Sequence, residues 1–161
     1  MRRIILNRQD FSELSDDILY QGGYLRFEAH GSSMSPFIRD GDMLTVQPVE
    51  ASALKVGDVA FYKAEFGQLI AHRVVAKRAQ DSQLTLVIRG NAPCCEDDIV
   101  PAIQILGRVT KLQRGEKMIR LDQRRWQVIS MLCARYPSLC FTLYRMARKA
   151  KKIALRYLNR V

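Results

Sequence analysis

Leu69-Ile70-Ala71-His72-Arg73-Val74-Val75 is an apolar stretch that is broken only by its histidine and arginine. Its β-branched residues are typical of a strand. Similar runs precede and follow it, and Gly, Asp and Pro residues separate them, as expected of turns. We expect strands at about 24–29, 43–46, 59–62, 69–75, 84–88 and 105–112. The sequence therefore predicts a mainly β domain of short, mostly antiparallel strands.

Helices are expected on both sides of this β region. Asp10-Phe11-Ser12-Glu13 has the spacing of a capping box, and Gly22-Gly23 ends the pattern, which predicts a short helix at about 11–20. Near the other end, Asp122 can cap a helix that runs to about Arg135.

Pro137 breaks that helix, and Ser138 can cap a last one that runs to near Asn159. We divide the chain into a helical lead-in at 1–23, a β domain at 24–115 and C-terminal basic helices at 116–161. A chain of 161 residues with 48% hydrophobic content can bury one substantial core.

Positive charge is concentrated at the C-terminal end. The formal net charge is +10, yet residues 1–122 balance sixteen carboxylates with sixteen Lys and Arg, whereas residues 123–161 hold ten Lys and Arg and no carboxylate. Apolar residues recur in the last helix at spacings of four and three, which places them on one face. These residues are Leu139, Leu143, Met146, Ala150, Ile153 and Tyr157.

Three partners are considered for this amphipathic basic helix. They are the β core or a second subunit, an anionic membrane surface, and nucleic acid. Nucleic acid ranks last because no recognised binding motif accompanies the basic residues, and no specific nucleic acid is expected. From Trp126 to Tyr144 only Arg135 is charged, but a central arginine costs at least roughly 2.5 kcal/mol on insertion, so a membrane span is not expected. The oligomeric state stays open.

Cysteine usage favours a reducing compartment. Cys94, Cys95, Cys133 and Cys140 form no CxxC pair and have no metal-ligand spacing. The apolar run within residues 1–8 is only three residues long, which is too short for a secretory signal. We expect a cytoplasmic protein, with the inner face of the membrane as its attachment surface if the basic helix binds lipid. No metal or organic cofactor is expected.

The chain contains one candidate nucleophile and one candidate base for acyl transfer. Ser33 lies in Gly31-Ser32-Ser33-Met34-Ser35-Pro36, and His72 follows it by thirty-nine positions. A serine hydroxyl needs a neighbouring base, and a histidine can serve near neutral pH. His30 is the rival base, but it lies three residues before Ser33, and such positions of an extended strand point to opposite faces.

These residues resemble the signal peptidase and LexA-like serine peptidases, whose nucleophile sits in Ser-Met-x-Pro, followed by a Gly-Asp turn such as Gly41-Asp42. Ser33 matches that serine. The segment around His72 resembles the Ser-His branch, which includes the endoplasmic-reticulum and archaeal signal peptidases. Ile88-Arg89-Gly90-Asn91 followed by Asp97-Asp98 is similar to the acidic box of that branch, and 105–109 to its closing strand. The resemblance spans about residues 24–112.

The resemblance implies a coiled, partly open β architecture and a serine endopeptidase that cleaves a peptide or preprotein next to small residues. Ser33 would be the nucleophile and His72 the general base. By its spacing from Gly90, Asp97 matches the family's catalytic aspartate, and Asp98 is the alternative, because Asn91 stands where the box begins with an acid.

The oxyanion hole would rest on the Ser33 N–H, with Ser32 as a secondary donor, because Gly31 stands where many signal peptidases have a serine. The substrate would lie extended along a strand edge.

Two other functions compete with that of a serine endopeptidase. The first is a peptidase-fold binding or maturation-accessory module that has lost turnover. The second is a LexA-like self-cleaving regulator, which His72 and the missing DNA-binding domain disfavour.

Overall fold

The computed structural model describes residues 7–80, 83–92 and 95–158. In these residues, eight strands form one open antiparallel sheet and three helices flank it, so the expected mainly β fold is confirmed. The strands are β1 (Leu25–Glu28), β2 (Met43–Gln47), β3 (Val59–Lys63), β4 (Leu69–Gln80), β5 (Gln83–Arg89), β6 (Asp97–Pro101), β7 (Ile105–Arg114) and β8 (Lys117–Arg120).

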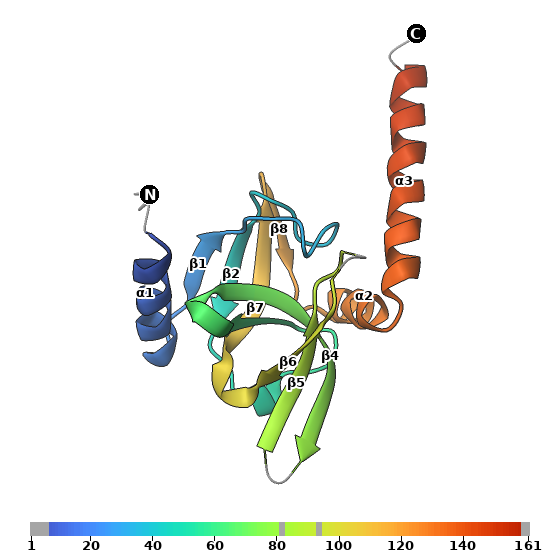
Figure 1. Ribbon diagram of the computed structural model, residues 1–161. Coiled ribbons are helices and arrows are strands. Elements are labelled where there is room, and N and C mark those ends of the chain that lie inside the picture. The colour runs from blue at the N-terminus through green and yellow to red at the C-terminus, as the bar shows by residue number, and fades with distance from the viewer. Residues whose placement is uncertain (1–6, 81–82, 93–94, 159–161) are drawn as a thin grey trace.

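The sheet has the order β1-β2-β7-β3-β4-β5-β6, and β8 pairs with β7. Single 3₁₀ turns at Ala51–Ala53, Glu65–Gly67 and Ala102–Gln104 join some of the strands. The long β4 and β5 pair along most of their length and project as the ribbon at the bottom of Figure 1.

Each face of the sheet covers its own apolar core, because successive side chains of a strand point to opposite faces. On β3, Phe61 belongs to one core and Tyr62 to the other. The first core also contains Leu44, Val46 and Val109. The second core also contains residues of β4, β5 and β6, namely Val74, Leu86, Ile88 and Val100.

The N-terminal helix α1 (Arg8–Tyr20) packs on the first core through Phe11, Ile18 and Leu19. It is confirmed but begins earlier than expected, because Asn7 is the N-cap and its side chain accepts a hydrogen bond of 2.8 Å from the Asp10 N–H. The N-terminal run at 1–6 lies outside the described residues.

The C-terminal helices are α2 (Arg124–Arg135) and α3 (Pro137–Leu158). The N-cap of α2 is Gln123 rather than Asp122, whose carboxylate pairs with Arg120 instead. The expected end at Asn159 lies outside the described residues. Figure 1 shows α2 against the strands, while α3 extends away from them. Within the described ranges, none of the helices has both the length and the apolar character that crossing a bilayer requires.

Two strands were not expected from the sequence. β6 begins with two aspartates and ends at Pro101, and it lies at an edge of the sheet, where polar side chains and proline are tolerated. β8 forms a hairpin with β7 around the turn that contains Gly115. The expected domain boundary at 115 therefore falls inside a β-hairpin, and the sheet continues to Arg120.

Candidate active site

The candidate nucleophile lies on the loop between β1 and β2. Met34 and Ile38 are buried in the first core and anchor this loop. Two turn hydrogen bonds order it, from the Ser35 N–H to the Ser32 carbonyl and from the Ile38 N–H to the Met34 carbonyl, both 3.0 Å long. The Ser35–Pro36 peptide bond is cis. Ser33 itself is half-buried, and the buried neighbours and turn hydrogen bonds of the loop define its position.

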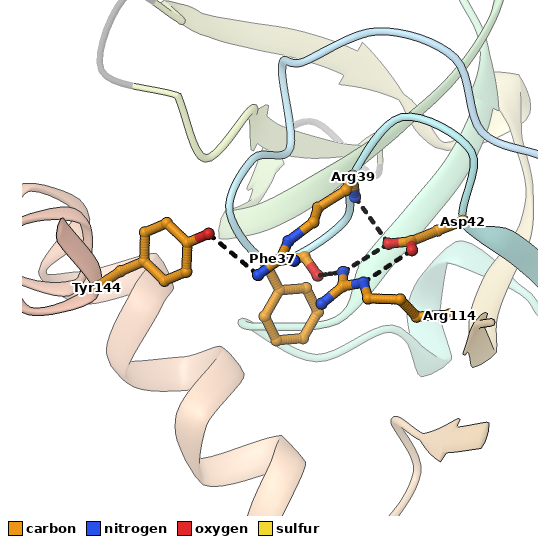
Figure 2. Close-up of polar contacts among 5 residues, drawn as sticks. All are labelled: Phe37, Arg39, Asp42, Arg114 and Tyr144. Atoms are coloured by element: carbon orange, nitrogen blue, oxygen red, sulfur yellow. Dashed lines mark hydrogen bonds and ion pairs between the residues drawn. The ribbon is translucent and has the colours of Figure 1, made fainter. Parts of the chain in front are cut away.

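A partly buried ion pair between Asp42 and Arg114 holds the far side of the loop (Figure 2). Asp42 accepts hydrogen bonds from the Arg114 guanidinium on β7, at 2.6 and 2.8 Å, and from the Arg39 N–H at 2.8 Å. Arg114 also donates to the Phe37 carbonyl at 3.0 Å. The hydrogen bonds that Arg114 donates to Asp42 raise the pKa of Arg114 above its ordinary value. The Gly-Asp turn therefore ties the loop to the sheet.

The Ser33 carbonyl is held from the other side by the β5–β6 connection. The Ala92 N–H donates to it at 2.8 Å. Gly90 also packs against it, because a Cβ at this position would lie 2.7 Å from the carbonyl oxygen. Among the residues that the structure describes, none accepts a hydrogen bond from the Ser33 N–H. This N–H is the backbone donor that the sequence predicts for an oxyanion hole.

The side chain of His72 contacts the hydroxyl of Ser33. It lies on β4, opposite Ala60 of β3, and its Nε2 is 2.9 Å from the Ser33 Oγ. Burial lowers the pKa of His72 below its ordinary value, and the Asp98 carboxylate opposes this effect without cancelling it. Burial therefore favours the neutral imidazole, which is the form that can accept a serine proton.

Strand register decides which aspartate shares a face with His72. His72 and Val74 lie on one face of β4, Val74 is opposite Ile88 of β5, and Ile88 is opposite Asp98 of β6. Asp97 is opposite Arg89, on the other face, and its carboxylate pairs with Arg89 at 3.1 Å. The structure thus brings Asp98, not the expected Asp97, to the side of the base.

Tyr62 of β3 fixes the Asp98 carboxylate. Its hydroxyl donates to Asp98 Oδ2 at 3.2 Å, and its ring centroid lies 6.4 Å from that of His72. Burial, together with the neighbouring carboxylate, raises the pKa of Tyr62 far above its ordinary value, so it stays a donor. His72 Nδ1 is buried and has no hydrogen-bond partner within the described ranges. Sequence reasoning missed Tyr62, which looks like any aromatic residue of a buried strand.

The residue after His72 explains the role of Asn91. Arg73 is almost fully buried, and its Nε donates to Asn91 Oδ1 at 3.0 Å. Its Nη1 donates to the Gly57 carbonyl at 2.7 Å, and the guanidinium lies over the Phe37 ring at 4.3 Å. Asn91 therefore supports the loop that holds Ser33, through Arg73, and does not contact the imidazole.

The remaining candidates lie apart from the Ser33–His72 pair. His30 is exposed, and its Nδ1 is 3.8 Å from Asp40. Ser32 is exposed and its hydroxyl contacts none of the described site residues. It lines an open cleft between the nucleophile loop and α3, together with Arg39, Tyr144 and Arg148. Sequence reasoning missed this cleft because α3 is distant in the chain.

The cysteines do not form a metal site in the part of the chain that is described. Cys95 lies against the Ser33 carbonyl, with its Sγ at 3.7 Å. Cys133 of α2 and Cys140 of α3 are thiols in contact with each other, and burial raises the pKa of Cys133 to about 11. Cys94 lies outside the described residues.

A comparison of the chain with models of known protein families and with curated proteins finds no match. The assignment of a function therefore rests on the geometry of the site.

Proposed function

We propose that this protein is a serine endopeptidase that uses Ser33 as nucleophile and His72 as general base and acid. The observation that carries the proposal is the 2.9 Å approach of Nε2 of the half-buried His72 imidazole to the Ser33 hydroxyl. Such a pair is the minimal unit of serine hydrolases, in which the base takes the hydroxyl proton while the oxygen attacks a carbonyl.

The reaction needs two further groups, and the surroundings of the pair supply candidates for both. The Ser33 N–H can donate to the oxyanion of the tetrahedral intermediate. Asp98 is a negative charge on the His72 side of the sheet, held by Tyr62, and it favours the imidazolium that forms during attack. Protonated His72 then returns the proton to the leaving amine, and water releases the acyl group.

The proposed substrate is an extended peptide with a small residue at the cut. β1 leads directly to the Ser33 loop and has only β2 as a strand partner in the described sheet. A peptide strand can add to such an edge through backbone hydrogen bonds, which bind chains of varied sequence. We place the protein in the cytoplasm, or at the inner membrane face if its C-terminal helices bind lipid.

Cleavage of a peptide library by the intact protein tests this proposal. We expect products cut after small residues, and a loss of roughly a thousandfold or more in kcat/KM for Ser33→Ala. Ser32→Ala is the matched control, because the neighbouring hydroxyl does not contact His72, and it should keep most of the activity. Equal losses in the two variants would overturn the assignment of the nucleophile. No cleavage by any form would favour a binding module that has lost turnover.

A further inference from the structure

The part of the apolar stripe of helix α3 whose burial is described, from Leu139 to Ala150, is exposed rather than packed on the β core. Among the α3 side chains whose burial is described, those of Pro137, Cys140, Phe141 and Tyr144 are partly buried, and Arg39 donates a 3.0 Å hydrogen bond to the Tyr144 hydroxyl (Figure 2). Leu139, Leu143 and Met146 are 57%, 57% and 62% exposed. Residues three or four apart share a helix face, so these two groups occupy different sides of α3. Packing on this protein's own core does not explain the stripe.

The preceding helix α2 also has an uncovered apolar side. Its Trp126, Ser130 and Ala134 face the body of the protein, and the α2 backbone at Met131 packs directly on Gly57. The apolar side chains left exposed on and just after this helix are Val128, Ile129, Met131, Leu132 and Tyr136. Exposed apolar side chains are ordinary when scattered, but this many on two consecutive helices indicates an interaction surface.

The charge of the same segment indicates the kind of partner. Beyond Asp122 the sequence contains no carboxylate and ten Lys and Arg. Arg145 and Lys149 are exposed on α3, and the exposed Met146 lies between them in the sequence. The surface therefore offers apolar side chains and cations together, without an acidic residue to neutralise them.

We propose that the exposed side of α2 and α3 docks on an anionic lipid surface. In that position Leu139, Leu143 and Met146 enter the boundary between headgroups and acyl chains, while the flanking Arg and Lys side chains contact lipid phosphates or carboxylates. An amphipathic basic helix binds membranes by this combination of apolar burial and charge attraction. The docked helix spans no bilayer, and the hydrogen bond between Tyr144 and Arg39 links it to the loop that carries Ser33.

Other partners fit the surface less well. A second copy of α3 would bring like charges face to face, since the segment lacks any carboxylate. Nucleic acid would satisfy the cations, but its phosphate backbone would leave Leu143 and Met146 without an apolar partner.

Co-sedimentation of the full-length protein with vesicles tests the proposal. We expect binding to vesicles of phosphatidylcholine and phosphatidylserine, little binding to pure phosphatidylcholine, and weaker binding at high salt, because exposed charges are screened over about 8 Å at physiological ionic strength. The double variant Leu143→Glu/Met146→Glu should lower the partition coefficient by about tenfold or more, because two apolar anchors are lost.

The matched control is Ile103→Glu/Met118→Glu, which changes the net charge equally at two exposed apolar residues outside the helices. It should bind like the unaltered protein, and circular dichroism of both variants confirms that they fold. Equal losses of vesicle binding in the two double variants would show that only the net charge matters, and would overturn the proposed docking surface. The proposal is also overturned if the protein binds neither vesicle, or if it forms a dimer that Leu143→Glu/Met146→Glu disrupts.

Discussion

At the scale of single residues, the chemistry depends on which side of a strand each side chain occupies. Asp97 and Asp98 are neighbours in the chain, yet one pairs with Arg89 and the other lies on the face of His72. A shift of one residue along a strand exchanges its faces. Ser33 and His72 could be proposed from sequence because the segments that contain them, Ser-Met-x-Pro and the strand around His72, resemble those of a peptidase family. The aspartate could not, because its face depends on the register of β4, β5 and β6.

The pH dependence of acylation should report the environment of His72. Because burial holds its pKa below the ordinary 6.5, the base stays unprotonated to a lower pH than a free histidine. We expect the acylation rate to rise with pH to a plateau and to reach half of that plateau at a pH below 6.5. Stability should also decline below pH 6.5, since the unfolded imidazole takes up a proton first.

The rate is measured by stopped-flow acylation with an activated ester, and His30→Ala should reproduce the same profile. A midpoint above pH 6.5, or a midpoint that moves in His30→Ala, would contradict the role given to His72.

Replacement of the two aspartates separates their roles. Asp98→Asn should lower kcat/KM by about tenfold to a hundredfold, because it removes the charge that favours imidazolium. The loss should be smaller than the roughly 10⁴-fold effect in triads where the carboxylate bonds the histidine directly. Asp97→Asn breaks only the exposed pair with Arg89 and should have little effect on kcat/KM. A larger loss in Asp97→Asn would restore Asp97 as the orienting carboxylate.

At the scale of elements, the strands with apolar or alternating sequence were predictable and the polar edge strand was not. The run 69–75 lies within β4, which extends to Gln80 because its second half pairs with β5 in a projecting ribbon. Asp97-Asp98 is typical of a loop in sequence, and it forms a strand here because an edge strand tolerates exposed charged side chains. The C-terminal helices were predictable from their periodicity, but the periodicity does not say whether the apolar side meets the core or a partner.

The close packing of the β5–β6 connection on the nucleophile loop predicts a severe effect of Gly90→Ala. The added Cβ would meet the Ser33 carbonyl oxygen at 2.7 Å and the Cys95 sulfur at 2.5 Å, so the loop must move. We expect the acylation rate to fall at least about tenfold, since displacements of about 1 Å at a reacting group are costly.

Gly115→Ala is the control for general destabilisation. The φ of +56° at Gly115 disfavours any residue with a side chain, but a Cβ there meets no atom within 4 Å. It should lower the melting temperature and leave acylation of the folded protein unchanged. Unchanged acylation in Gly90→Ala would show that Ser33 is not positioned by this contact.

At the scale of the whole molecule, the open sheet brings together residues from four separate stretches of the chain. The β1–β2 loop supplies Ser33, β3 supplies Tyr62, β4 supplies His72 and β6 supplies Asp98. The C-terminal helices attach to this assembly through α2, and they leave an apolar basic surface uncovered. The two proposals together give the protein a peptidase site and a separate lipid-docking surface, and the variants described above test each one by itself.

Reaction of the intact protein with a serine-directed fluorophosphonate tests the central claim most directly. We predict that mass spectrometry finds one adduct, on Ser33, and that Ser32→Ala forms it while Ser33→Ala does not. His72→Ala should form it far more slowly, because the proton acceptor 2.9 Å from the hydroxyl is gone. An adduct that persists in Ser33→Ala, or no adduct on the folded protein at any pH above 6.5, would contradict the account.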